Sequence, residues 1–525
     1  YNHSRSGKGW RENSGYEVRN SHAYFAYQFS PNTKLSLEYT NMDYEMQQAG
    51  GLTDAQFKDN PRQSLRDRNW FGTPWNLAAL ILDTKLASNL TLNTKFFGLI
   101  GERNSVGFIA TPNDFDNRQV DRDFYKNLGV ETRSIYAYKL GKLDQNLAFG
   151  ARLYRANTTR KQQGKGTTSS DFDLAVDGRF VRDLDFQTDN IAFFAENQFK
   201  INNKLSITPG IRFENIKSTI DGRFGISNGT DVNVTPESLS RNKVLLGIGV
   251  EYKLNKTNFY ANFSQAFRPV LFSDITPPAT TDVIDENLKD ADGFNLDLGY
   301  RGNLLGWINF DVSYFYLNYD NRIGPIRKFV NDDPSQSTFL FRTNLGTTVH
   351  KGVESFVDLN ISKAMKVNQQ IGDLQFFTSL SFIDATYTDF KTTQISGTAP
   401  NIVITESNLA GNRVENAPRY IHNFGITWSF KGFSSTLQNR RTGMVYSDAN
   451  NTETPSANGV TGKLDGYSVY DLSMEFRFLE KFNIRGGINN LDNTIYATRR
   501  AGGYPGPGIL PNDTRTFFLS IGVKL

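Results

Sequence analysis

Cysteine is absent from this sequence of 525 residues, and histidine is scarce. Without cysteine the chain has no disulfides, no thiolate metal sites and no cysteine nucleophile. The four histidines are scattered, and no two of them stand at the spacing of metal ligands: His3, His22, His350 and His422. A catalytic base or a metal centre would need such residues close together. We therefore expect a protein that is not an enzyme and that carries no cofactor.

Long apolar runs are missing too. The longest spans residues 77–82, whereas a membrane-crossing helix needs about 20 consecutive apolar residues. The charges are nearly balanced, with 58 Lys+Arg against 54 Asp+Glu, and too dispersed to indicate a nucleic-acid partner. The chain begins at Tyr1 without a secretory signal, so we expect that a signal and a further upstream segment have been removed. A role in a membrane would have to come from strands.

The sequence does contain a strong period-two alternation of apolar and polar residues, which is typical of strands with two different environments. One example sets apolar residues at 470, 472, 474, 476 and 478 against Asp471, Ser473, Glu475 and Arg477. Such segments recur through the chain as about nineteen strands of roughly ten residues or more, long enough to cross a bilayer at a tilt. A barrel with a wet lumen also explains the mean hydropathy of -0.47, because every second strand residue is polar.

The connections between these strands alternate between short and long. Short turns are expected at 30–32, 87–89, 140–142, 202–203, 255–256, 302–303, 431–432 and 480–481. Long polar loops are expected at 46–69, 104–121, 160–184, 217–238, 269–285, 324–337, 390–412, 447–463 and 499–512. One turn, at 361–371, is longer than the other short ones. This alternation predicts an outer-membrane barrel with periplasmic turns and extracellular loops, whereas a soluble sandwich would carry long loops at both ends.

Parity adds an expectation about completeness. A single-chain bacterial barrel closes with an even number of strands, so we expect about three strands upstream of residue 1 and about 22 in all. A barrel of that size encloses a wide lumen, and we expect an N-terminal plug domain in the same upstream part. Residues 1–525 are then a single β-barrel domain.

Six short motifs in order along the chain resemble those of the TonB-dependent receptors, and in particular the ferric dicitrate receptors. They are Gly50 to Gln56 (GGLTDAQ), Thr208 to Glu214 (TPGIRFE), Asn262 to Pro269 (NFSQAFRP), His350 to Glu354 (HKGVE), Asn416 to Tyr420 (NAPRY) and Gly487 to Asp492 (GINNLD). Two positions depart from the family pattern. Lys289-Asp290-Ala291 stands where Lys-Pro-Glu is usual, and the chain ends in Leu525 where Phe is usual.

The resemblance implies an active transporter of the bacterial outer membrane that imports a ferric chelate, ferric citrate or another ferric siderophore, with energy from the TonB system. Iron would travel as part of the substrate. TonB would contact the missing N-terminal region, and outer-membrane lipid and lipopolysaccharide would surround the barrel. Importers of cobalamin or glycans, and a passive porin or adhesin barrel, are the alternatives.

The resemblance also implies where the ligand binds. The ferric dicitrate receptors grip carboxylates with arginines on loops and the upper barrel wall, and the matching positions here are Arg103, Arg122 and Arg182. Arginine suits this task because its guanidinium donates two parallel hydrogen bonds to one carboxylate. Arg327 is a fourth candidate, although the family has a neutral amide there. The alternative is that these arginines contact lipopolysaccharide or solvent.

Overall fold

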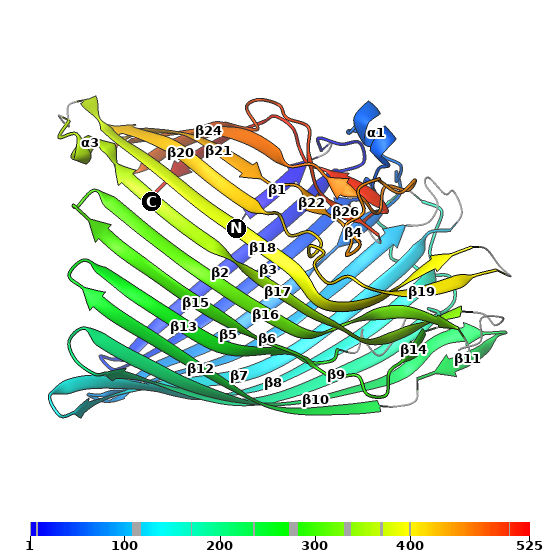
Figure 1. Cartoon of the computed structure of the whole chain (residues 1–525), viewed down its shortest axis with the longest axis horizontal. Helices are drawn as coiled ribbons and strands as arrows, with labels where there is room; N and C mark the ends of the chain where they lie inside the picture. The colour runs from blue at the N-terminus through cyan, green and yellow to red at the C-terminus, as the bar shows by residue number, and fades with distance from the viewer. Residues whose placement is uncertain are drawn as a thin grey trace.

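Most of the described strands form one large, mainly antiparallel sheet in which successive long strands lie side by side (Figure 1). The computed structural model describes residues 2–6, 9–107, 117–169, 171–234, 237–271, 282–329, 338–367, 371–397, 401–502 and 505–524. In Figure 1 the strands are strongly tilted and the sheet curves round, so that the first strands, in blue, lie behind the later ones in green and yellow. This is the large antiparallel β-barrel fold that the alternating pattern predicts.

Nineteen of the described strands are eight residues or longer, which confirms the predicted number in this chain. They are β2 (Tyr16–Ser30), β3 (Thr33–Gln47), β5 (Trp75–Ala87), β6 (Leu90–Gly107), β7 (Gln119–Leu140), β8 (Leu143–Lys165), β9 (Arg182–Lys200), β10 (Leu205–Ser227), β12 (Glu237–Leu254), β13 (Thr257–Arg268), β15 (Ala291–Leu304), β16 (Ile308–Phe329), β17 (Thr338–Asn360), β18 (Asp373–Ser396), β20 (Tyr420–Phe430), β21 (Phe433–Thr442), β24 (Tyr467–Phe478), β25 (Phe482–Asn489) and β28 (Thr516–Val523).

Shorter elements lie at the ends of these strands or in the loops. They are β1 (Asn2–Ser6), β4 (Trp70–Gly72), β11 (Thr230–Asn233), β14 (Asp282–Ile284), β19 (Val403–Asn408), β22 (Val445–Tyr446), β23 (Lys463–Leu464), β26 (Ala497–Ala501), β27 (Gly508–Pro511) and the helices α1 (Asp54–Asp59) and α3 (Ile361–Ala364). No helix of the described residues is long and apolar enough to cross a membrane.

The outer face of the sheet carries an apolar belt. On β28, Phe517, Leu519 and Ile521 are 72%, 73% and 70% exposed, and they alternate with residues of the inner face. Phe25 on β2 and Leu128 on β7 are exposed to a similar degree. Because burial of apolar surface is worth roughly 25 cal/mol per Å², a continuous belt of such side chains indicates contact with lipid rather than water.

The predicted short turns lie together at one end of the barrel. β2 and β3, for example, meet at the pair Ser30 and Thr33. The longer turn expected at 361–371 contains α3, whose first turn is capped by Asn360. The Asn360 side chain accepts a hydrogen bond of 2.8 Å from the backbone N–H of Lys363. The strand connections at this end therefore follow the predicted topology.

At the opposite, extracellular end several strands are longer than predicted. β10 continues to Ser227 and folds back as a hairpin with β11, and β18 continues to Ser396 and pairs with β19. The expectation of loop structure was therefore wrong for 217–227 and 390–396. Beyond the membrane neither face of a strand meets lipid, so the contrast between its two faces weakens although its backbone hydrogen bonds continue.

The inner wall contains glycines that lie directly opposite aromatic residues. A Cβ built on these glycines would come within 2.2–2.8 Å of the facing ring, so each ring lies over the backbone of its glycine partner. The pairs are Phe97 with Gly129, Phe194 with Gly150, Tyr260 with Gly299, Phe315 with Gly352, Phe377 with Gly425 and Phe518 with Gly487. Each ring covers backbone that a glycine would otherwise leave exposed, a known means of stabilising glycines in sheets.

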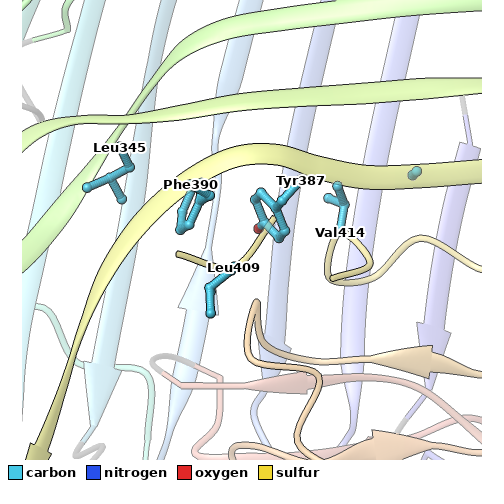
Figure 2. Packing of buried hydrophobic residues seen from close by; sticks show 6 residues of the cluster. Leu345, Tyr387, Phe390, Leu409 and Val414 are labelled. Carbon is cyan, nitrogen blue, oxygen red and sulfur yellow. The ribbon is translucent and has the colours of Figure 1, made fainter. Parts of the chain in front are cut away.

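One extracellular segment packs against the inner wall. Figure 2 shows Leu409 and Val414, from the segment after β19, near Tyr387 and Phe390 of β18, with which they form one hydrophobic cluster. The backbone joins the two segments as well, since the Val414 N–H donates to the Ala385 carbonyl at 3.0 Å. The result is a small hydrophobic core at the extracellular mouth.

The first long loop also packs against the last ones, 446 residues away in sequence. The Arg500 guanidinium donates two hydrogen bonds of 2.7 Å to the carboxylate of Asp54, the first residue of α1. Leu52 and Ile509 exchange two backbone hydrogen bonds of 2.9 and 2.8 Å. Figure 1 shows α1 and β26 close together at the extracellular end. We call these contacts of Leu52 and Asp54 with Ile509 and Arg500 the loop clasp.

Candidate functional site at the extracellular mouth

Charged side chains gather near the extracellular ends of β6 to β9. Arg103 on β6 lies opposite Asp123 on β7, which in turn lies opposite Arg160 on β8. Two residues further along β8, Gln162 lies opposite Arg182 at the start of β9. Residues two apart in a strand share a face, so all five side chains are on the same side of the sheet. We call Arg103, Arg160 and Arg182 the luminal arginine row.

The luminal arginine row is on the inner face of the barrel. On β6 the outer belt is formed by Phe96 and Ile100, which are both well exposed. Arg103 has the opposite parity and shares its face with Lys95. The row therefore faces the lumen, where an incoming solute would pass.

Asp123 lies between two of the arginines and is almost fully buried. It accepts hydrogen bonds from Arg160 of 3.0 Å at Oδ1 and 3.4 Å at Oδ2, and Arg103 approaches the same Oδ2 at 3.5 Å. A buried carboxylate is stable only when it is paired, and Asp123 meets this need with two cations. Arg103 remains 40% exposed, so its second guanidinium edge is accessible from the lumen.

Arg182 has a different environment, because its hydrogen-bond partners are neutral. It donates to the Gln162 side-chain oxygen at 3.0 Å and to the Phe224 carbonyl at 3.4 Å, and its guanidinium lies 4.6 Å from the centre of the Phe224 ring. Within the part of the chain that the structure describes, no carboxylate lies within ion-pair distance of Arg182. The arginine is thus held in place while its charge is not cancelled by a direct partner.

The local charges do not balance. Asp121 also faces the lumen, and its carboxylate accepts hydrogen bonds from the Gln119 side chain at 2.9 Å and the Gln163 backbone N–H at 2.7 Å. Three guanidinium groups therefore stand against two carboxylates, Asp121 and Asp123. Near a protein surface such an excess cation attracts anions more strongly than it would in bulk water.

Three of the four arginines expected from sequence have described side chains, and these lie on two different faces of the sheet. Arg103 and Arg182 belong to the luminal arginine row. Arg122 is on the opposite, outer face, where it donates to Glu102 at 2.6 Å and to Asn104 at 3.0 Å. The side chain of Arg327 lies outside the described residues, although its backbone belongs to β16. Ligand contact by these residues stays a prediction.

Arg160 and Asp123 were missed in the reading of the sequence. Arg160 was assigned to a loop, yet it continues the period-two series of Arg152, Tyr154 and Thr158 on β8. That periodicity was the available signal for Arg160. The role of Asp123 could not be read in the same way, because it depends on the pairing between strands.

A second charged cluster lies on the wall formed by β16 and β18. Arg322 forms an ion pair with Glu415, and its guanidinium also donates a hydrogen bond of 2.8 Å to the phenol oxygen of Tyr387. Burial tends to raise the pKa of Glu415, but its hydrogen bonds with Arg322 and Tyr387 outweigh this and hold the pKa below its usual value. Arg322 has a full counter-charge, so this cluster is less suited than Arg182 to attract an anion.

One sequence pattern could suggest an enzyme, since residues 225–229 read Gly-Ile-Ser-Asn-Gly. In serine hydrolases a G-x-S-x-G pattern forms a sharp turn between a strand and a helix. Here it forms the turn of the hairpin between β10 and β11, with Asn228 and Gly229 at φ 49° and 78°. Asn-Gly in this conformation is a common two-residue hairpin turn.

Comparison with known proteins places this barrel in a family. The sequence model described as TonB dependent receptor-like, beta-barrel, matches residues 8–491. The chain belongs to the TonB-dependent receptors. Members of this family are outer-membrane transporters rather than enzymes, which confirms the predicted location and class.

Solved structures of TonB-dependent receptors have the same fold. The unliganded ferric citrate transporter FecA superposes with a TM-score of 0.80 at 20% identity, over 100% of this chain and 72% of that one. The ferric-catecholate import receptor Fiu from E. coli K12 gives 0.73 at 15% identity, over 99% and 76%. The siderophore receptor PiuA from Acinetobacter baumannii gives 0.75 at 13% identity, over 99% and 76%. At these identities the likeness concerns the fold of the receptor and not its cargo.

Proposed function

We propose that this TonB-dependent receptor imports an anionic ferric chelate, with ferric citrate or another carboxylate-bearing ferric siderophore as the cargo and the TonB system as the energy source. The observation that carries the proposal is Arg182, a luminal cation held by neutral partners at the mouth of the barrel. The motif series supports the same cargo class.

The luminal arginine row can bind carboxylates in a definite way. Arg182 keeps its position through Gln162 and Phe224 and offers its remaining N–H groups to a ligand. The Arg103 guanidinium lies 3.5 Å from the Asp123 carboxylate, which is a long contact for an ion pair. A ligand carboxylate can therefore replace part of it at a small cost in free energy. Two guanidinium groups on one wall would orient a chelate with several carboxylates. The iron would stay within its chelate, and the protein would supply no metal ligand.

Arg122 contributes less in this proposal, because Glu102 and Asn104 already accept its hydrogen bonds on the outer face. Arg327 remains a candidate from the other wall. A neutral cargo such as a glycan would form no ion pair with the luminal arginine row. The charge of the cargo is therefore the property to test.

The test is a calorimetric titration of the purified full-length receptor with ferric citrate and, separately, with a ferric siderophore complex of zero net charge. We expect Arg182→Gln and Arg103→Gln each to weaken ferric citrate binding by about tenfold to a hundredfold, the cost of losing one charge-assisted hydrogen-bonded contact. Arg19→Gln is the matched control, since Arg19 is an exposed arginine on the outer face that pairs with Glu17.

The salt dependence provides a second readout. Binding that rests on the luminal arginine row should weaken as ionic strength rises, because screening reduces the attraction between exposed charges. Equal affinity for the charged and the neutral complex, unchanged in both arginine variants, would rule out the proposed cargo. It would leave the family assignment intact.

A further inference from the structure

The hairpin formed by β10 and β11 contacts the chain segment that leads into Arg182. Arg223 on β10 donates hydrogen bonds of 2.7 Å to the carbonyl of Phe180 and of 3.2 Å to the carbonyl of Val181. The next residue, Phe224, accepts a hydrogen bond from Arg182 at its carbonyl, and its ring lies against the Arg182 guanidinium. Two successive residues of the hairpin therefore hold three successive residues at the start of β9.

Phe224 holds Arg182 from an irregular position in its strand. Between Arg223 and Gly225 the pairing with β11 shifts by one residue, so Phe224 is the extra residue of a β-bulge. A bulge bends its strand and changes the direction in which its residues point, and bulges are frequent beside functional sites. Here the bulge lies at the residue whose carbonyl and ring contact Arg182. The irregularity therefore serves the position of the arginine rather than the pairing of the hairpin.

Asp231 on β11 ties the hairpin to the loop before β9. One oxygen of its carboxylate lies 2.8 Å from Arg179 of that loop, and the other lies 3.2 Å from Arg223. This ion pair holds Arg223 in the place from which it reaches the carbonyls of Phe180 and Val181. The Arg223 side chain is only 15% exposed, so water screens its charge less than that of a fully exposed residue.

The orientation of Arg182 matters because a guanidinium binds a carboxylate best when two of its N–H groups point at it in one plane. Gln162 accepts a hydrogen bond from Nη1 of Arg182, and the Phe224 carbonyl accepts one from Nε. The N–H groups that remain, on Nη1 and Nη2, form one edge of the guanidinium. The two partners therefore decide which edge Arg182 presents to a ligand.

We propose that Asp231 is a positioning residue for cargo binding. Through Arg223 and the bulge at Phe224, it sets the direction in which Arg182 presents its free edge to an anionic cargo. This inference rests on the proposed function, because it takes Arg182 as a contact of the cargo. Asp231 acts without touching the cargo, and the β10–β11 hairpin becomes part of the binding machinery although it belongs to the extracellular rim.

The first readout is the Arg182 side chain itself, observed by nuclear magnetic resonance in the full-length receptor with isotope-labelled arginine. Its Nε–H signal is the one that disappears in Arg182→Gln. The Phe224 ring should shift this signal, because the guanidinium carbon lies 4.6 Å from the ring centre. Phe224→Leu should remove the shift, and Asp231→Asn should reduce it. Asp177→Asn is the matched control, because Asp177 is an exposed aspartate of the same loop that pairs with Lys165 at 3.0 Å.

The second readout is a calorimetric titration of the same variants with ferric citrate. Asp231→Asn should weaken binding by about threefold to tenfold, less than Arg182→Gln does, because Arg182 keeps its charge and loses only its orientation. In the Arg182→Gln background Asp231→Asn should have no further effect, since both changes act on one contact. Asp231→Glu keeps the carboxylate and should retain the natural affinity. The heat-dependent gel mobility of each variant reports whether its barrel has formed.

An Arg182 signal that is the same in Asp231→Asn and in the natural protein would overturn the proposal, whatever the cargo. So would a loss of affinity from Asp231→Asn that is equally large with and without Arg182. A natural receptor that does not bind ferric citrate would refute the proposed cargo instead. The Arg182 signal would then decide by itself whether Asp231 positions this arginine, so the two failures are distinguishable.

Discussion

The loop clasp makes a quantitative prediction about the extracellular rim. The Arg500 side chain is 1% exposed and donates four hydrogen bonds, two to Asp54 and two of 2.9 Å to the carbonyls of Gly459 and Lys463. Asp54→Asn keeps the shape of the side chain but removes the one carboxylate that forms an ion pair with this buried cation among the described residues. Removal of one partner from a buried pair costs about 3–5 kcal/mol.

The expected cost is smaller here because Asp54 is 39% exposed and water screens the pair on that side. We therefore expect about 2 kcal/mol for local opening of the clasp, which corresponds to about a thirtyfold change in the opening equilibrium. The barrel itself should remain folded, since its backbone ladder does not involve these residues.

Hydrogen exchange measures this opening directly. The amides of Leu52 and Ile509 donate to each other's carbonyls across the clasp, so both should exchange about thirtyfold faster in Asp54→Asn. Asp59→Asn is the matched control, because Asp59 is an exposed carboxylate at the other end of α1. Exchange at Leu52 and Ile509 that is unchanged in Asp54→Asn, or equally fast in the control, would refute the reasoning.

Two further predictions concern the inner wall and the mouth. Gly129→Ala places a Cβ 2.4 Å from the Phe97 ring and should lower stability by about 1–3 kcal/mol in a urea titration, whereas Gly225→Ala, with open space around it, should not. The pKa of Glu415 is lowered in the folded protein, so its ion pair with Arg322 stabilises the surrounding segment at neutral pH. This stabilisation is lost as the pH falls below 4.5, the usual pKa of a glutamate, because the carboxylate then becomes protonated. Limited proteolysis near Val414 should therefore increase in acid, and Glu415→Gln should remove that pH dependence; a cleavage rate that is independent of pH in the natural protein would contradict it.

The strand content and topology could be predicted because both depend on local signals. Period-two alternation identifies a strand wherever one face meets lipid and the other meets water, and loop length separates the two ends of the barrel. The same reasoning failed above the membrane. There neither face of a strand meets lipid, and the extension of β18 from Lys391 to Ser396 shows no regular alternation although its backbone is paired with β19. The extension of β10 did keep a signal, since Ile220, Phe224 and Ile226 alternate with Asp221, Arg223 and Ser227.

The capping of α1 is a signal that the sequence contained and that was overlooked. Thr53 and Gln56 form a capping box, in which each side chain accepts a hydrogen bond from the other's backbone N–H. The spacing of Thr and Gln three residues apart is a recognised start of a helix. The helix within the loop predicted at 46–69 could therefore have been expected.

The sequence by itself determined the class of the protein. Its alternation, its turn and loop lengths and its motif series all depend on neighbouring residues. Together they are enough to identify an outer-membrane barrel of the TonB-dependent receptors. Only the tertiary structure decided which charges meet. Arg103 and Arg122 are similar in sequence context, yet strand register turns one to the lumen and the other outward. Asp54 and Arg500 meet because the curvature of the whole sheet brings the first and last loops together. Partners of this kind depend on register and on closure over hundreds of residues, and no local pattern encodes either.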